Sequence, residues 1–133
     1  FSMARTQSWR DDVRAGMQAL LLQNQGKVNA IWASFDGQAY IIDDLLKSQG
    51  VKKGQIPIVS VDGGSETFRR IADPESLLTA SVVIPFEEMG RKAVESVEAI
   101  AIKKQSKETI VSGPYLFTES VIVDKTNVAQ FIK

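Results

Sequence analysis

Apolar residues recur along the chain in short continuous runs separated by helical stripes. Two runs, Val28–Ala33 and Ile56–Val61, each lead into a turn that carries an acidic residue, Asp36 and Asp62. After each turn the apolar spacing changes to the three- and four-residue steps of a helix. A third run, Thr79–Ile84, is rich in β-branched residues, which strands favour. The near-continuous apolar run Val28–Ala33 predicts a strand that is covered on both faces.

Helical stripes precede, separate and follow these strands. The faces predicted to be buried are Val13, Met17, Leu20 and Leu21 in the first helix, Ala39, Ile42, Leu45 and Leu46 in the second, and Met89, Ala93, Val94, Val97, Ile100 and Ala101 in the fourth. A short third helix follows Ser65 and is stopped by Asp73-Pro74. The segment Tyr115–Val123 is predicted to be extended. The resulting order, α-β-α-β-α-β-α-β, indicates an α/β fold with a three-layer α-β-α parallel sheet.

Composition narrows the function classes. The 133 residues suffice for one domain, and we expect residues 1–133 to form one. Sixteen basic residues balance sixteen acidic ones, which removes any bulk electrostatic argument for nucleic acid. Cysteine and histidine are both absent, so the chain lacks thiol chemistry and the commonest metal ligand and general base. We therefore expect no metal, no cofactor and no enzymatic activity.

The two acidic turns are the strongest candidate for a binding site. Carboxyl ends of parallel strands and amino ends of helices meet at one edge of an open sheet, where ligands bind. Asp36 and Asp62 should therefore lie at the same edge. A pair of carboxylates also occurs in glycosidases, but that reaction depends on a separation that the sequence does not contain.

Four segments, in order, resemble the C-terminal lobe of periplasmic sugar-binding proteins of the ribose-binding type. They are the strand with Asp36 and a helix closed by Gly50, the segment Val59-Ser60-Val61-Asp62-Gly63-Gly64, the strand Leu78–Val83 with Pro85 and Met89-Gly90-Arg91-Lys92-Ala93-Val94, and the ending Val121–Val128 with Lys125-Thr126-Asn127. Each segment alone is common in α/β proteins. Together they cover the chain from about Trp9 to Val128, which makes the resemblance fairly specific.

This resemblance implies a function and a larger context. Proteins of this kind have two lobes and bind a monosaccharide or polyol between them. The chain is therefore expected to be the C-terminal lobe of a longer protein, without the N-terminal lobe. It implies a periplasmic or lipoprotein component of an ABC sugar importer that presents its closed form to a membrane permease. The alternative is the effector domain of a lactose-repressor-type regulator. A third class is a sensor that docks a membrane kinase.

The resemblance also implies roles for particular residues. Asp62 stands where relatives accept hydrogen bonds from sugar hydroxyls, although an Asp can also cap the turn or the following helix. Asp36 either contacts the sugar or caps its helix. Phe35 replaces the family's usual amide and either stacks on a pyranose or joins the core, and Trp9 is either a sugar platform or a surface residue. Ile84 replaces a frequent ligand-binding Gln, so the ligand should differ from ribose.

The helix predicted over Phe86–Lys104 poses a separate question. In relatives it crosses the hinge and packs on the other lobe, so here its apolar stripe needs another cover. Each large apolar side chain left in water forfeits roughly 1.5–3 kcal/mol. We therefore expect this helix either to fold back on its own sheet or to mediate a homo-oligomer.

Overall fold

The computed structural model describes residues 7–111 and 113–132. These residues form two compact units. The first contains the chain up to Val83 and again from Ile122, and the second is formed by Ile84–Val121. The chain thus leaves the first unit after its third strand and returns for its fourth. Trp9, Phe35, Asp36 and Asp62, the four candidate site residues, all belong to the first unit.

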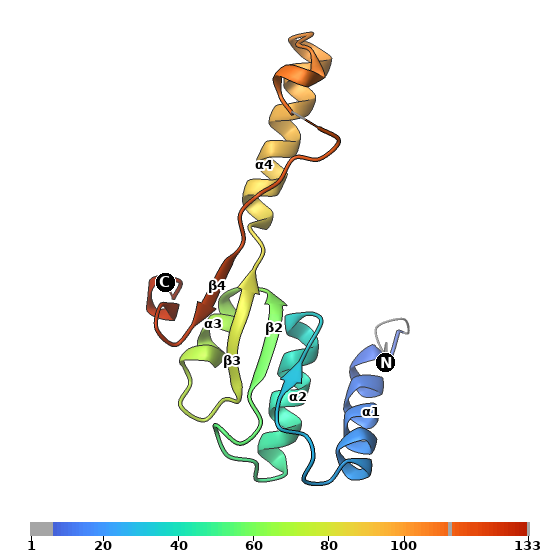
Figure 1. Cartoon of the computed structure of the whole chain (residues 1–133), viewed down its shortest axis with the longest axis vertical. Helices are drawn as coiled ribbons and strands as arrows, with labels where there is room; N and C mark the ends of the chain where they lie inside the picture. The colour runs from blue at the N-terminus through green and yellow to red at the C-terminus, as the bar shows by residue number, and fades with distance from the viewer. Residues whose placement is uncertain (1–6, 112, 133) are drawn as a thin grey trace. The chain divides into compact units, whose positions relative to one another are not determined.

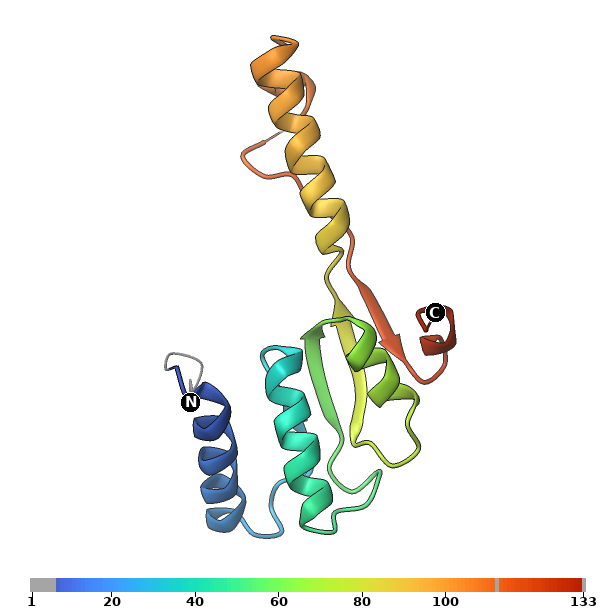
Figure 2. The ribbon, with the colours of Figure 1, turned by 180° about the vertical axis from the view of Figure 1, so that it is seen from behind.

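A four-stranded sheet with the order β1-β2-β3-β4 forms the centre of the first unit. Its strands are Ile31–Trp32 (β1), Ile58–Asp62 (β2), Leu78–Val83 (β3) and Val121–Asp124 (β4). β1 is parallel to β2 and β2 to β3, which confirms the prediction of three adjacent parallel strands. β4 departs from the all-parallel expectation, because its arrow runs opposite to that of β3 in both ribbon views (Figure 1, Figure 2). Only the last part of the predicted extended segment, Tyr115–Val123, is in this strand.

Two helices cover one face of this sheet. α2 (Asp36–Ser48) and α3 (Ser65–Ala72) connect successive strands, and they lie behind β2 and β3 in Figure 1 and in front of them in Figure 2. The apolar stripe predicted for α2 is buried at every position, namely Ala39, Ile42, Leu45 and Leu46. α2 ends before Gly50, which has the positive φ of 78° that glycine adopts without strain.

The first helix, α1 (Trp9–Gln23), packs along α2. It buries Val13 and Met17, whereas Leu20 of the same predicted stripe is exposed. Only part of the apolar face predicted for α1 is therefore buried. A short 3-10 turn, η3 (Val128–Gln130), follows β4 and buries Val128.

The sheet face opposite α2 and α3 is less covered than the apolar runs predict. Trp32 and Val59 are register partners in β1 and β2, so their side chains share a face, and they are 68 % and 39 % exposed. Of the predicted strand Val28–Ala33, only two residues pair. Because the Trp32 side chain is largely exposed, the expectation that this run is covered on both faces is wrong.

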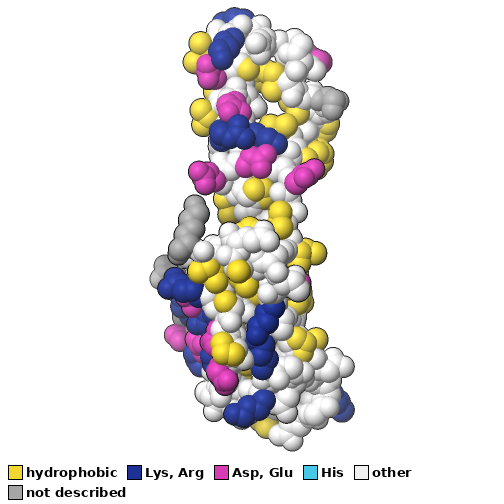
Figure 3. Space-filling view, turned by 90° about the vertical axis from the view of Figure 1, so that its left-hand side faces the viewer, with side chains coloured by type: hydrophobic (Ala, Val, Ile, Leu, Met, Phe, Trp, Pro, Cys, Tyr) yellow, Lys and Arg dark blue, Asp and Glu magenta, His cyan; other side chains and the backbone are white. Residues whose placement is uncertain are grey.

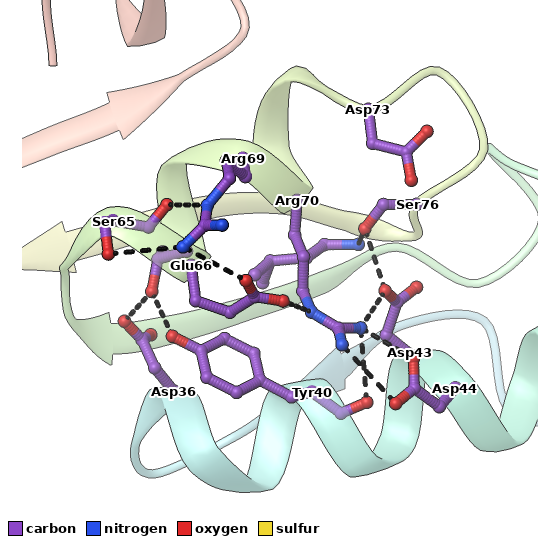
Figure 4. A network of polar contacts seen from close by, with 12 residues as sticks. Asp36, Tyr40, Asp43, Asp44, Ser65, Glu66, Arg69, Arg70, Asp73 and Ser76 are labelled. Atoms are coloured by element: carbon purple, nitrogen blue, oxygen red, sulfur yellow. Dashed lines mark hydrogen bonds and ion pairs between the residues drawn. The ribbon is translucent and has the colours of Figure 1, made fainter. Parts of the chain in front are cut away.

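A charged network ties α2 to α3 and to the start of β3 (Figure 4). The fully buried Asp43 carboxylate accepts a hydrogen bond from the Arg70 guanidinium at 2.8 Å. It also accepts hydrogen bonds from the backbone N–H of Leu77 at 2.8 Å and the hydroxyl of Ser76 at 3.0 Å. Arg70 bonds Asp44 at 2.7 Å as well. The network holds the last turn of α3 against α2.

The second unit contains α4 (Phe86–Val97), a π-helical turn η1 (Glu98–Ile102) and a 3-10 turn η2 (Lys107–Thr109). Pro85 stands at the N-cap of α4, as its position at a helix entrance predicts. No residue of α4 is buried, and Val94 and Val97 are among its most exposed side chains. Figure 3 shows hydrophobic side chains at the surface of this unit, between charged ones. Within this unit the predicted apolar stripe is therefore left exposed, and what covers it stays a prediction.

Candidate functional site

The site lies at the carboxyl ends of β1 and β2, where each strand leads into a helix. β1 is followed by a turn in which Phe35 stands at the N-cap and Asp36 begins α2. β2 ends at Asp62 and leads through Gly63 and Gly64 into α3. The Gly63 backbone N–H donates to the Asp36 carboxylate at 2.8 Å, so the two turns are in direct contact. The expected shared edge for the two acidic turns is thus present.

Asp62 has an unusual backbone. Its φ is 123°, a conformation that residues other than glycine rarely adopt. Such outliers persist only where the surroundings enforce them, and they cluster at functional sites. The next residue, Gly63, also has a positive φ of 88°, and a Cβ there would lie 2.7 Å from the Val83 side chain. The turn is therefore tightly constrained, and it holds the Asp62 carboxyl in a partly exposed position.

The ionisation of Asp62 is perturbed by its surroundings. Partial burial raises the pKa of Asp62, and the negative charge of Asp36 raises it further. A hydrogen bond from the backbone N–H of Asp36 acts in the opposite direction. The hydrogen bond from Gly63 to Asp36 places the Asp62 turn beside the amino end of α2. A carboxylate that is partly desolvated and still accessible suits hydroxyl groups as hydrogen-bond donors.

Two of the predicted aromatic residues are in contact. The rings of Trp9 and Phe35 have centroids 5.3 Å apart and are tilted by 58°. A Cβ at Gly37 would meet the Phe35 ring at 2.8 Å and the Trp9 ring at 3.0 Å, so the small residue lets both rings lie against α2. Both aromatic residues are half-buried, and the Arg10 guanidinium lies 4.5 Å from the centre of the Trp9 ring. The structure thus places an aromatic pair beside the turn that precedes Asp36.

Asp36 does not face the solvent. The residue is 4 % exposed, and both carboxylate oxygens accept hydrogen bonds from the interior. The donors are the hydroxyls of Ser60, Thr67 and Ser81 and the Gly63 N–H. The direct sugar contact expected for Asp36 is not supported by this geometry, because neither carboxylate oxygen is free to meet a ligand.

Three hydroxyl residues around Asp36 were not among the predicted site residues. Ser60 and Ser81 are register partners in β2 and β3, and Thr67 is in α3. A signal for them existed, since a small polar residue interrupts each of two apolar strands. Only the folded chain shows that these interruptions lie opposite the same carboxylate.

Other features lie outside this edge of the sheet. A groove of about 470 Å³ between α1 and β1 is lined by residues including Met17 and Trp32, and by none of the four candidate residues. Among residues 7–111 and 113–132, no group of acidic side chains is arranged to hold a metal ion. In the same residues, no helix combines the length and the apolar character that crossing a membrane requires.

No protein-family model matches the chain, and no curated protein sequence matches it either. Solved structures, in contrast, do match the chain. The chain is similar to an ABC transporter solute-binding protein from Agrobacterium vitis with bound allitol, at 24 % identity and a TM-score of 0.78, covering 93 % of this chain and 41 % of that one. It is similar to an ABC sugar transporter subunit from Rhodobacter sphaeroides, at 26 % identity and a TM-score of 0.78, covering 96 % of this chain and 43 % of that one.

A third similar structure is the periplasmic binding protein of the arabinose ABC transporter from a Shewanella species, bound to L-arabinofuranose. Its identity is 25 % and its TM-score 0.75, with 92 % of this chain and 38 % of that one covered. The chain therefore has the fold of one lobe of an ABC-transporter solute-binding protein. It spans about two fifths of the length of these structures. These neighbours are described as binding and transport proteins rather than as enzymes.

Proposed function

We propose that the chain is the C-terminal lobe of a protein that binds a sugar or polyol for an ABC importer. The observation that carries the proposal is the arrangement around Asp62, a strained and partly exposed carboxylate beside an aromatic pair at the carboxyl ends of the strands. The fold likeness to sugar- and polyol-binding proteins supports it. The binding edge is where an open α/β sheet presents ligand sites.

Each residue has a defined part in this proposal. Asp62 accepts hydrogen bonds from two ligand hydroxyls, since an ionised carboxylate has two oxygens and forms stronger bonds than a neutral group. The half-buried rings of Phe35 and Trp9 offer an apolar face to the C–H side of a sugar ring. Asp36 is not a contact residue in this scheme.

The complete protein would work by closure. The ligand binds one lobe first, the second lobe completes its hydrogen bonds, and the closed form is the one that the permease recognises. The protein would act in the periplasm or as an extracellular lipoprotein. It binds and releases its ligand without chemical change, in keeping with the transport proteins whose fold it shares.

Nuclear magnetic resonance on the isolated chain tests the site. Hexitols, pentoses and hexoses at tens of millimolar should shift the Trp9 indole signal and the Gly63 amide signal, because half a site retains weak affinity. Changing Asp62→Asn should reduce these shifts, and changing Asp73→Asn, at the far end of α3, should leave them unchanged. Shifts that are absent for every ligand, or that map away from these residues, would refute the proposed site.

Calorimetry tests whether a single lobe binds a sugar with high affinity. A single lobe supplies about half of the hydrogen bonds and cannot enclose the ligand, so the benefit of water exclusion is lost. We therefore expect no micromolar binding of any monosaccharide by these 133 residues. Micromolar or tighter binding by the isolated chain would contradict the one-lobe proposal.

A further inference from the structure

The most concentrated polar interaction in the first unit surrounds the Asp36 carboxylate. One oxygen accepts hydrogen bonds from the Ser60 hydroxyl in β2 and the Ser81 hydroxyl in β3, the second of these at 3.0 Å. The other oxygen accepts the Gly63 backbone N–H at 2.8 Å and the Thr67 hydroxyl in α3. One side chain therefore joins two strands, a turn and a second helix to the start of α2.

These donors are all neutral. Among the described residues, no ion pair involves Asp36, so its charge is offset by hydrogen bonds and by the amino end of α2, where negative charge is favoured. Burying a charge without a nearby cation costs folding free energy, so the presence of this carboxylate needs an explanation. A neutral side chain of similar size would fill the same space at lower cost. The contact with Gly63 supplies the reason, because it fixes the backbone that follows Asp62.

The Asp36 side chain accepts the backbone N–H of Gly63 at 2.8 Å. This hydrogen bond ties the start of α2 to the end of β2 and fixes the orientation of the peptide between Asp62 and Gly63. It holds the backbone next to Asp62, whose φ is 123°.

We propose that Asp36 is the positioning residue for Asp62: its buried carboxylate clamps the Asp62–Gly63 turn in the conformation that presents the Asp62 carboxyl to a ligand. The inference rests on the proposed function for the ligand, but the clamp itself is a property of the free chain. It also accounts for the strain at Asp62. Without an acceptor at position 36, the peptide between Asp62 and Gly63 is free to rotate to a relaxed conformation.

Two substitutions separate the clamp from a general role in the core. Asp36→Asn keeps one oxygen that can accept the Gly63 N–H, while its amide group can donate to the Ser60 and Ser81 hydroxyls. It therefore preserves the clamp and removes the charge. Asp36→Ala removes both. Ser81→Ala is the matched control, because it deletes a hydrogen bond to the same carboxylate on the side away from Gly63.

Two measurements on the free chain report the clamp. Hydrogen exchange of the Gly63 amide should be about tenfold faster in Asp36→Ala, close to the loss of one hydrogen bond, and near the native rate in Asp36→Asn and Ser81→Ala. The pKa of Asp62, followed by its carboxyl carbon signal, should fall in Asp36→Asn because the repelling charge is gone, and should stay at the native value in Ser81→Ala. The pKa change tests the interaction between the two carboxyls, whereas the selective change in Gly63 exchange tests the clamp.

The ligand-induced shifts then link the clamp to binding. In the same titrations with hexitols and pentoses, Asp36→Ala should weaken the response by about tenfold, and Asp36→Asn should retain most of it. A folded Asp36→Ala chain with native Gly63 exchange would overturn the positioning role. If the exchange and pKa results are as expected but the native chain responds to no ligand, the clamp is supported and the proposed function is refuted.

Discussion

Replacing Arg70 with methionine is expected to destabilise the first unit more than any other substitution of a charged side chain on α3. Arg70 is only 19 % exposed and contacts the carboxylates of Asp43, Asp44 and Glu66 at 2.7–2.8 Å. Burial acts to lower the pKa of Arg70, but these three partners hold it above its ordinary value, so the guanidinium remains charged. Methionine retains much of the stem but leaves the fully buried Asp43 without its cation.

The magnitude follows from that buried carboxylate. Removing one partner of a buried ion pair costs about 3–5 kcal/mol. We expect the lower end, about 3 kcal/mol, because Asp43 keeps two uncharged donors, the Ser76 hydroxyl and the Leu77 N–H. Against a total stability of about 5–15 kcal/mol, such a loss is easily measured.

Urea unfolding followed by circular dichroism at neutral pH provides the assay, with the neighbouring Arg69 as control. Arg69 is 67 % exposed and lies 3.7 Å from Glu66 on the same helix, so Arg69→Met should cost less than about 1 kcal/mol. Equal losses for the two methionine variants, or a loss below about 1 kcal/mol for Arg70→Met, would refute the reasoning.

A double-mutant cycle strengthens the test. Asp43→Asn removes the buried charge but can still accept the backbone N–H of Leu77 with its amide oxygen. In the Arg70→Met background this change should cost less than it does alone, with a coupling energy of about 2 kcal/mol. Additive losses would show that Asp43 and Arg70 do not act as a buried pair.

Three further outcomes are expected. Gly63→Ala should destabilise the chain by at least about 2 kcal/mol in urea unfolding, because the new methyl group meets a valine side chain of β3. The control Gly26→Ala, which has a positive φ but open space around it, should cost about 1 kcal/mol. Equal costs for the two variants would argue against close packing at the turn. Because folding raises the pKa of Asp62, the contribution of this carboxyl to stability is present below the ordinary Asp pKa and is lost as pH rises through the folded-state pKa. Asp62→Asn should therefore stabilise the chain at pH 7 and lose that advantage in acid. No gain in stability at pH 7 would contradict the direction of the pKa shift. Because α4 buries none of its residues, light scattering should find a dimer or larger species that dissociates when Val94 and Val97 are changed to aspartate. A monomeric native chain would rule out association through this helix.

Local patterns were sufficient for most of the elements. Apolar spacing placed α2 and its buried face correctly, because a helix turns by a constant angle per residue and its stripe is set within the segment itself. Glycine and proline marked its ends, and those of α3, because their backbone preferences are also local. The meeting of the Asp36 and Asp62 turns followed from the rule that parallel strands present their carboxyl ends at one edge.

The role of each side chain depended on contacts between segments that are distant in the sequence. Asp36 and Asp62 stand in similar strand–turn–helix settings, yet one is buried under four donors from β2, β3, the turn and α3, and the other remains accessible in a strained backbone. Trp32 was placed in a covered strand, but its side chain is largely exposed, because cover depends on elements that come from elsewhere in the sequence. The sequence determined which segments form strands and helices and where their ends meet. Tertiary structure decided which carboxylate faces inward, because burial is a property of the assembled chain and not of any single segment.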